Sequence, residues 1–418
     1  MPLKEKLLIE RIRRAAGRGS RSAGVGIGDD CAVLRLPRGH EVLVTTDFSL
    51  EDVHFRREWH PADSVGHRCL ARGLSDIAAM GGVPRAAFLS LALPPELPQK
   101  WVDQFVSGLL KLAKRYSVPL AGGDTAQSPA GILADIVVLG SAPVGKAVLR
   151  SGAKPGDLLY VTGTLGSSVA TLNRLRDGEK LKPKSHPKHF YPEPRIAVGQ
   201  FLREKKLVSA MIDISDGLST DLGHICDESK AGAVVYAEAL PMAGCQPEAR
   251  DNNSPGRKPW VGAGKRFESL QGRRSERALA FGSKGAYVNA ALSRAEHQPT
   301  PADSKAHFVS EHGLSRAVRQ TRLVSGHDFS RAENGPIESG ALAPEGNLRD
   351  SEPLFLALHG GEEYELLFTA RPNRHIPKQI AGVPITQIGE IVGGKQMKLA
   401  KADGRTEILR PAGWEHFG

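Results

Sequence analysis

Cysteine is scarce in this chain of 418 residues, which holds only Cys31, Cys69, Cys226 and Cys245. These four lie far apart and form no Cys-x-x-Cys pair, which argues against a disulfide framework and against a zinc site. The same scarcity fits a reducing compartment, so we expect a cytoplasmic protein. No uninterrupted apolar run is long enough to span a bilayer, and the amphipathic residues 1–12 lack the apolar core of a signal peptide. We therefore expect no membrane partner.

Neither charge sign dominates the chain, which has 56 Lys and Arg residues against 46 Asp and Glu residues, a net charge of +10. With 40% hydrophobic and 24% charged residues, the composition is ordinary for a globular protein, and the length allows two domains. The positive balance permits nucleic-acid binding, but no recognisable nucleic-acid-binding motif accompanies it. A basic surface without a special role is the favoured interpretation, and nucleic acid is not an expected partner.

Two acidic residues are predicted to face each other across a hairpin. Residues 31–36 and 41–47 have strand character, and the segment 37–40 between them is typical of a turn. In that register Asp30 lies opposite Asp47, with Cβ atoms roughly 5 Å apart. Two bare carboxylates so close would repel, so the pair favours a Mg²⁺ site that carries substrate phosphates. The alternative stays open that one aspartate caps the strand and the other lies in solvent.

The rest of the chain alternates helices and strands around one unusual stretch. We predict helices at 62–80 and 101–116, strands at 118–121, 132–139 and 158–163, and a turn-rich domain junction at 150–157. Residues 245–352 are rich in Arg, Ser, Gly, Ala and Pro and show little apolar periodicity. Such a stretch cannot bury enough apolar area to offset its ordering entropy. We predict a largely disordered insertion there, with a basic tether for RNA or a partner as the alternative.

Four further acidic clusters stand at predicted ends of strands or helices. They contain Asp76, Asp124, the pair Asp213 and Asp216, and the run 362–365. Taken singly, each is more often a cap or turn residue than a ligand. Together, and mostly flanked by glycine that lets a phosphate approach the backbone, they indicate one phosphate and metal site.

Two other segments resemble phosphate-binding loops. Residues 140–147 fit GxxxxGK, but Ala147 stands where Ser or Thr should bind Mg²⁺, so we interpret the segment as a turn. Residues 163–168 suit an anion at a helix start, although a plain strand-to-helix turn is the favoured interpretation. No Ser/His/Asp or Cys/His arrangement follows from the spacing, so no nucleophile is predicted.

Eight motifs occur in an order that resembles the thiamine-monophosphate kinase family. They are GIGDDCA (26–32), TTD (45–47), HF (54–55), LSDIAAMG (74–81), GGDT (122–125), RSGA (150–153), DISDGL (213–218) and GGEEYEL (360–366). The resemblance covers residues 1–244 and 353–418. The wider superfamily includes aminoimidazole ribonucleotide synthetase, selenophosphate synthetase and a hydrogenase maturation protein.

The resemblance implies an α/β fold of the α+β type, in which two domains of the aminoimidazole ribonucleotide synthetase kind have mixed sheets packed with helices. Residues 1–148 would form an N-terminal domain for ATP, Mg²⁺ and dimerisation. Residues 149–244 and 353–418 would form the C-terminal domain, and 245–352 the insertion. A homodimer through the N-terminal sheets is the implied assembly.

The implied reaction is transfer of the γ-phosphoryl group of ATP to thiamine monophosphate, with several Mg²⁺ ions and no catalytic side chain. By motif, the metal ligands would be Asp30, Thr45, Thr46, Asp47, Asp76, Asp124, Asp213 and Asp216. ATP would contact Gly123, Asp124, Arg150 and Ser215. The second substrate would contact His54, Glu363 and Trp414. Glu363 departs from the family, which usually has Asp there, and Trp414 has the alternative role of a hydrophobic terminal anchor.

Two other functions stay open at this point. One is a superfamily sibling that acts on another acceptor, although the chain has no cysteine before Cys31, which the selenophosphate branch normally needs. The other is an inactive enzyme whose basic insertion binds nucleic acid.

Overall fold

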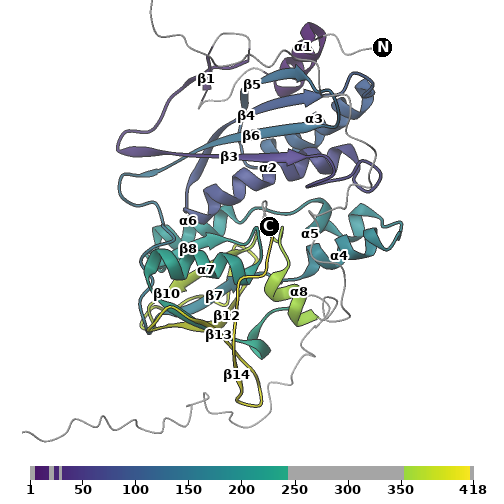
Figure 1. Cartoon of the computed structure of the whole chain (residues 1–418). Coiled ribbons are helices and arrows are strands. Elements are labelled where there is room, and N and C mark those ends of the chain that lie inside the picture. Colours follow the sequence, from purple (N-terminus) through teal and green to yellow (C-terminus); the bar gives the residue numbers. More distant parts are fainter. Residues whose placement is uncertain (1–4, 18–22, 28–30, 243–352, 415–418) are drawn as a thin grey trace, which may run out of the picture. The chain divides into compact units, whose positions relative to one another are not determined.

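The computed structural model describes residues 5–17, 23–27, 31–242 and 353–414, which belong to one compact unit (Figure 1). Asp30 and the insertion 245–352 lie outside the described residues, so their predicted roles stay predictions. The domain limits at residues 148 and 149 also stay predictions. None of the helices within the described ranges is long and apolar enough to cross a membrane.

The first half of the chain contains a four-stranded sheet and three helices. Its elements are α1 (Glu5–Ala16), β1 (Ala23–Val25), β2 (Val33–Leu34), β3 (His40–Leu50), α2 (Ala62–Ala79), β4 (Val83–Leu93), α3 (Gln99–Arg115), β5 (Leu120–Gln127) and β6 (Leu133–Pro143). The sheet has the order β3-β6-β4-β5, and only β4 and β5 run parallel. Both predicted helices are confirmed, as α2 and α3.

The predicted hairpin between residues 31–36 and 41–47 is wrong. β2 pairs with β1, whereas β3 pairs along its whole length with β6, from His40 opposite Pro143 to Leu50 opposite Leu133. The prediction assumed that strands adjacent in sequence pair with each other. A partner almost one hundred residues away, β6, offers eleven matched positions to the eleven-residue β3. Asp47 therefore lies opposite Ile136, on a hydrophobic strand.

Helices α2 and α3 cover one face of this sheet and approach each other closely. A Cβ atom on Gly66 of α2 would lie 1.9 Å from the carbonyl oxygen of Phe105, and one on Gly108 of α3 would lie 1.9 Å from that of Asp63. Only glycine permits this contact at either position. The contact places α2, and the polar residues along it, directly against β3 and β6 (Figure 1).

The second half contains a larger mixed sheet. Its elements are β7 (Leu158–Thr162), α4 (Ser167–Arg176), η1 (Pro183–Ser185), α5 (Pro187–Phe190), α6 (Ile196–Glu204), β8 (Ala210–Asp213), α7 (Leu218–Ser229), β9 (Gly232–Tyr236), η2 (Ala237–Ala239), α8 (Pro353–His359), β10 (Leu366–Ala370), β11 (Gln379–Ile380), β12 (Val383–Val392), β13 (Met397–Ala400) and β14 (Thr406–Ile408). The strand order is β14-β13-β9-β12-β7-β10-β8, with β11 beside β12.

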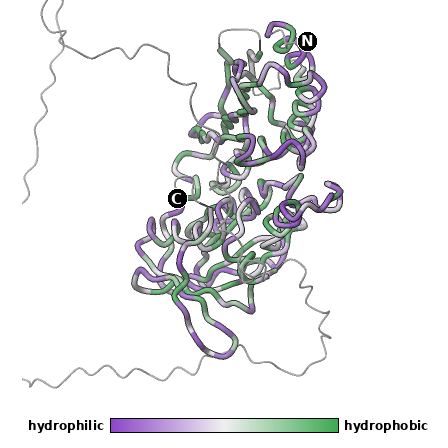
Figure 2. Tube along the Cα trace, turned by 45° about the vertical axis from the view of Figure 1, so that its right-hand side comes forward, coloured by the Kyte–Doolittle hydropathy of each residue, from purple (hydrophilic) through white to green (hydrophobic). Residues whose placement is uncertain are grey.

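This second sheet is hydrophobic on both faces, and each face joins a different core. In β10, Leu366 and Phe368 pack into the core that contains α2 and α6, whereas Leu367 packs into the core that contains α7. In β7, Tyr160 and Val161 divide between the two cores in the same way. Alternate residues of a strand point to opposite faces, which explains this division. The short green and purple stretches along the chain in Figure 2 show the mixed hydropathy within single elements.

Candidate functional site

Three aspartates from separate elements form an acidic cluster. Asp47 lies near the end of β3, Asp76 lies in the last turn of α2, and Asp213 is the last residue of β8. The Thr45 hydroxyl donates a hydrogen bond to Asp76. The Ser75 hydroxyl donates one to Asp213 Oδ2 at 2.6 Å. The structure thus gathers four of the predicted metal ligands, Thr45 and the three aspartates.

The electrostatics of this cluster favour protonation of its carboxyl groups. Burial, followed by repulsion from Asp76, raises the pKa of Asp47 to about 7. Burial and then repulsion from Asp76 raise the pKa of Asp213 well above its usual range. Burial also raises the pKa of Asp76, against the hydrogen bond from Thr45 and the nearby charge of Arg150. Because the charge of Arg150 lowers the pKa of Asp76, Arg150 lies near the cluster. Arg150 is one of the predicted ATP contacts.

One oxygen of the cluster shows that a cation fits. Asp47 Oδ2 is buried and has no hydrogen-bond partner among the described residues. A buried carboxylate oxygen without a partner carries a desolvation cost that a cation would remove. Hard carboxylate and hydroxyl oxygens are the ligands that suit Mg²⁺. The residues present therefore fit the divalent metal that the motifs imply.

Two further predicted metal ligands, Thr46 and Asp124, lie on the opposite face of the sheet. The Thr46 hydroxyl donates a 2.7 Å hydrogen bond to Asp135 Oδ1 of β6. Asp135 is paired with Ser90, which is paired with Asp124 of β5, so these side chains share one face. The alternation of β3 sends the side chain of Asp47 to the other face. The structure does not bring the side chains of Thr46 and Asp124 into the acidic cluster.

The GGDT motif lies within β5, although we predicted that it follows a strand. Gly123 has φ of 146°, and a Cβ atom there would lie 1.8 Å from the carbonyl oxygen of Leu89. No other residue fits this position without moving β4. The predicted ATP contact at Gly123 therefore coincides with a backbone position that requires glycine.

The segment after β8 is organised by an aspartate that the sequence analysis missed. Asp221 Oδ2 accepts hydrogen bonds from the backbone N–H groups of Ser215, Asp216 and Gly217, at 3.1, 3.2 and 3.1 Å. Burial, then the charge of Asp216, raises the pKa of Asp221 to about 7. Potential metal-ligand atoms of Asp216, Asp221 and His224 lie within 4.8 Å of one another. The metal role predicted for Asp216 thus has two further donors beside it.

Trp414 packs against this same segment. Its backbone N–H donates to the carbonyl oxygen of Asp216 at 3.0 Å, and the N–H of Gly413 donates to Thr220 Oγ1 at 3.0 Å. The Trp414 residue is half-buried. These contacts place it next to Asp216, while its predicted stacking on a substrate stays a prediction.

The GGEEYEL motif forms a strained loop that pairs with the end of β8. Glu362 and Tyr364 have φ of 59° and 52°, a left-handed conformation that is rare outside glycine. Their N–H groups donate to the carbonyl oxygens of Ser215 and Ile214, at 2.7 and 2.9 Å. These hydrogen bonds hold the loop beside the residues that follow Asp213.

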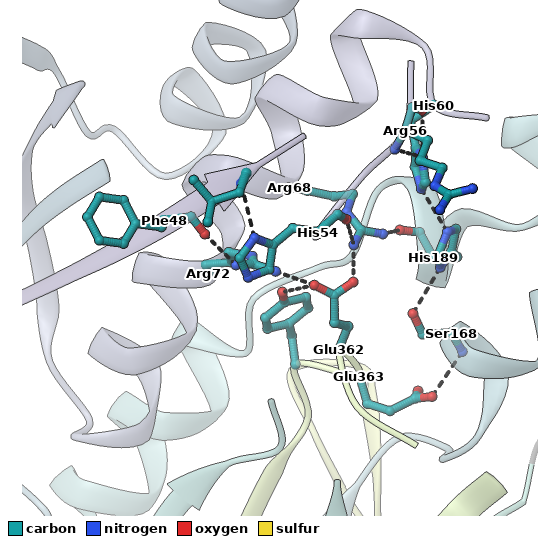
Figure 3. A network of polar contacts seen from close by, with 12 residues as sticks. Phe48, His54, Arg56, His60, Arg68, Arg72, Ser168, His189, Glu362 and Glu363 are labelled. Atoms are coloured by element: carbon teal, nitrogen blue, oxygen red, sulfur yellow. Dashed lines mark hydrogen bonds and ion pairs between the residues drawn. The ribbon is translucent and has the colours of Figure 1, made fainter. Parts of the chain in front are cut away.

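Glu362 contacts two arginines of α2 (Figure 3). Its carboxylate accepts hydrogen bonds from Arg68 and Arg72. Burial alone would raise the pKa of Glu362, but the two guanidinium charges outweigh it and hold the pKa far below its usual range. Glu362 is therefore ionised, and it joins the loop before β10 to helix α2 as the counterion of two arginines.

Glu363 points away from this pair, toward the first turn of α4 (Figure 3). Its Oε1 accepts a 2.9 Å hydrogen bond from the backbone N–H of Ser168, and its Oε2 lies 3.8 Å from Lys188 Nζ. Glu363 is 4% exposed, and burial raises its pKa to about 7. A carboxylate of the chain itself thus faces the helix start that was considered as an anion site.

The predicted substrate contacts His54 and Glu363 are not brought together by their side chains. His54 Nδ1 accepts a 3.0 Å hydrogen bond from the Leu50 backbone, and its carbonyl oxygen accepts one from Arg68 at 3.3 Å. It is Glu362 that shares Arg68 with His54. The substrate role of Glu363 stays a prediction, and the geometry favours its neighbour Glu362 as the closer residue.

Arg68 and Arg72 were not among the residues predicted from the sequence. A signal for them was present, because Arg68, Arg72 and Asp76 follow one another at intervals of four residues. That spacing places three polar residues on one face of an otherwise buried helix. The charged partner, Glu362, is almost three hundred residues away in sequence, which no local pattern reveals.

Comparison with known proteins decides the family. Models for the N-terminal and C-terminal domains of AIR synthase related proteins match residues 28–142 and 154–300. The thiamine-monophosphate kinase of Salmonella typhimurium is 45% identical over 226 residues, which are 52% of this chain and 67% of that protein. The chain belongs to the thiamine-monophosphate kinase family. This membership confirms the resemblance inferred from the eight motifs.

Solved structures of the family agree with the fold. The crystal structure of the thiamine-monophosphate kinase from Stenotrophomonas maltophilia K279a has a TM-score of 0.63 and 26% identity, and the match covers 97% of this chain and 98% of that one. A structure described as AaThiL complexed with AMPPCP and TMP has a TM-score of 0.60 and 24% identity, with 100% and 99% covered. The predicted α/β fold with two domains of this family is confirmed.

Proposed function

We propose that this protein transfers the γ-phosphoryl group of ATP to thiamine monophosphate and so forms thiamine diphosphate and ADP. Membership of the thiamine-monophosphate kinase family supports the reaction class. The name of the 45% identical relative and the AMPPCP and TMP of the AaThiL structure support the two substrates. The acidic cluster of Asp47, Asp76 and Asp213 is the observation in this chain that carries the proposal.

The chemistry needs charge neutralisation more than proton transfer. The acceptor is a phosphate oxygen that is already anionic near neutral pH, so no general base is required. Two phosphate groups must be brought into line against their mutual repulsion. A site built from carboxylates, without an activated serine or cysteine, suits a reaction in which metal ions neutralise that charge.

We assign the residues of this chain to metal, ATP and acceptor binding by their positions. Asp47, Asp76 and Asp213 would hold Mg²⁺, which when bound supplies charge neutralisation to the phosphates. Asp216, with Asp221 and His224 beside it, would hold a further metal. Arg150, Ser215 and the bare backbone at Gly123 would bind ATP. Thr46 and Asp124 have side chains on the outer face of the sheet, away from this cluster, so their metal role remains only what the motifs predict, as does that of Asp30 outside the described residues. His54, Glu363 and Trp414 would contact the acceptor.

A coupled assay of ADP release tests the proposal. The purified full chain is incubated with Mg²⁺-ATP and with thiamine monophosphate, thiamine, or no acceptor. We expect ADP to form only with thiamine monophosphate, and thiamine diphosphate to appear in equal amount. EDTA should abolish both. ADP formation that ignores the acceptor, or that favours thiamine, would contradict the proposed substrate.

We also propose a homodimer through the outer face of the first sheet. Val42, Val44 and Phe48 of β3 are 45%, 65% and 55% exposed, and they share that face. An apolar row along a strand at the edge of its sheet is a surface that proteins normally cover. Light scattering after gel filtration should give twice the chain mass, and Val44→Lys should give the monomer. A monomeric wild-type protein would contradict the assembly.

A further inference from the structure

Arg68 and Arg72 connect three separate parts of the chain. Arg68 is 3% exposed and donates to the carbonyl oxygens of His189, at 2.6 Å, and of His54, at 3.3 Å. Arg72 donates to the carbonyl oxygen of Phe48 at 2.6 Å. Both guanidinium groups also donate to the carboxylate of Glu362 (Figure 3).

We propose that Arg68 and Arg72 form a clamp on Glu362 that positions the acceptor side of the site, with Arg72 as a positioning residue. The inference rests on the proposed function, because it assigns the clamp to binding of thiamine monophosphate. Nothing in the eight motifs points to Arg72, which lies two residues before the LSDIAAMG run.

The two arginines hold the backbone between Phe48 and His54. Phe48 follows the cluster residue Asp47 directly in β3, and His54 closes the turn after that strand. Arg72 fixes the backbone at the start of this segment and Arg68 fixes it at the end. Both then join it to the Glu362 loop. A hydrogen bond from a planar guanidinium fixes direction as well as distance.

The loop that carries Glu362 has a strained backbone. Glu362 and Tyr364 both hold left-handed conformations, which persist only where surrounding contacts impose them. The Tyr364 hydroxyl lies 3.4 Å from Glu362 Oε1, on the side of Arg72. The side chains of Glu363 and Glu365 point the other way, to Ser168 and Lys188. Without Arg72, Glu362 would lose one of the two charges that oppose relaxation of the loop.

A second arginine–glutamate pair, away from the predicted site residues, provides a contrast. Arg115 of α3 pairs with Glu193, which also joins a helix of the first half to a segment of the second. Both side chains of that pair are exposed, and among the described residues neither has a hydrogen bond or ion pair with a predicted substrate or metal residue. Arg115→Gln is therefore a control for loss of an exposed arginine–glutamate contact that lies away from the site.

The test compares wild type with Arg72→Gln, Arg72→Lys, Glu362→Gln, the double variant and Arg115→Gln. For Arg72→Gln we expect the KM for thiamine monophosphate to rise at least about tenfold while the KM for ATP stays within about threefold. Arg72→Lys should recover part of the loss, because it keeps the charge. The double variant should be no worse than either single variant, because both remove the same contact. Arg115→Gln should behave as wild type.

The outcomes separate the clamp from general stability. A residue that serves stability alone would lower the melting temperature and the active fraction, and so kcat, but would leave both KM values unchanged. That result for Arg72→Gln would overturn the proposal, as would strict additivity with Glu362→Gln. If Arg72→Gln fails to fold, the Glu362→Gln variant decides by the same KM criterion.

A measurement without turnover separates this inference from the proposed function. Amide hydrogen exchange of Glu362 and Tyr364 reports whether the loop stays paired with Ser215 and Ile214. In Arg72→Gln we expect these amides to exchange at least about tenfold faster than in wild type. In Arg115→Gln we expect the exchange rates to be unchanged. If wild type does not phosphorylate thiamine monophosphate, the proposed function fails and exchange still judges the clamp. Unchanged exchange in Arg72→Gln would overturn the clamp.

Discussion

Two sets of buried acidic residues in this protein behave in opposite ways. Asp47, Asp76 and Asp213 lie close together, and burial with mutual repulsion raises their pKa values. Glu365 is fully buried and Glu362 is half-buried, yet the pKa values of both lie below the usual range. For Glu362 the charges of two arginines outweigh burial, and for Glu365 the hydrogen bond from Arg195 and the charge of Lys188 do so. The comparison separates two effects on the pKa of a carboxyl group, that of burial and that of a basic side chain in contact with it.

The difference shows which carboxylates serve the fold and which await a ligand. A buried carboxylate with its own arginine is complete within the chain, and removing one partner leaves a buried charge. A buried carboxylate without a cation is complete only when one is bound. Asp47, Asp76 and Asp213 are of this second kind, which is why they are the candidate metal site.

The largest expected effect is a loss of stability when Glu365, a carboxylate with its own arginine, is replaced. Its carboxylate accepts two hydrogen bonds from Arg195, at 2.6 and 2.7 Å, and one from Thr162 Oγ1 at 2.6 Å. Glu365→Gln should destabilise the protein by about 3–5 kcal/mol, because Arg195 keeps a buried charge. Urea unfolding measures this loss. The control Glu407→Gln breaks the exposed pair with Lys401 and should change little.

Removal of one charge from the acidic cluster should affect activity and not the fold. Asp47→Asn should lower kcat about 10²–10³-fold, because one ligand of the phosphate-neutralising metal is lost. Its melting temperature without Mg²⁺ should equal or exceed that of wild type, because the repulsion with Asp76 is relieved. ADP release and calorimetry measure the two quantities. Asp403→Asn, at an exposed pair with Arg405, is the control, and near-normal turnover by Asp47→Asn would contradict the metal assignment.

The stability contributed by Glu363 should depend on pH, because burial raises its pKa to about 7 from an ordinary 4.5. This dependence tests whether a buried carboxyl group without its own arginine behaves like the acidic cluster. A raised pKa in the native state means that the native state binds the proton more tightly. The contribution of Glu363 to stability is therefore complete below about pH 4.5 and is lost as the pH rises through about 7.

Glu363→Gln removes this titration. Wild type should lose stability relative to the variant between pH 5 and pH 8, by at most about 3 kcal/mol. Urea unfolding at the two pH values measures the difference. A difference that stays constant with pH would show that Lys188 and Ser168 already compensate the charge of Glu363.

The smallest expected effect is stabilisation by Mg²⁺ alone. Binding to the native state should raise the melting temperature by a few degrees at millimolar Mg²⁺. The rise should be larger at pH 8 than at pH 5.5, because protons compete for Asp47, whose pKa is about 7. Asp47→Asn should lose this pH dependence. An equal rise at both pH values would place the bound ion elsewhere.

Several parts of the fold and site followed from local patterns. Helix α2 was predicted to within one residue, because its apolar residues recur at helical spacing before Gly81 and Gly82. Asp76 and Asp213 were assigned to ends of elements correctly. The pairing of β3 was not predictable in this way, because its partner β6 begins more than eighty residues after β3 ends. Choice of strand partner depends on the whole sheet rather than on the turn between neighbours.

What the sequence by itself determined is the set of chemical groups: aspartates near glycine, no nucleophilic cysteine, and motifs in the order of one kinase family. What only the tertiary structure decided is which groups meet. It placed Asp47 with Asp76 and Asp213, sent Thr46 and Asp124 to the other face of the sheet, and gave Glu362 two arginines while Glu363 faces Ser168. The physical reason is that the charge state of a buried carboxylate depends on burial and on the nearest opposite charge. Both are set by contacts between residues far apart in sequence.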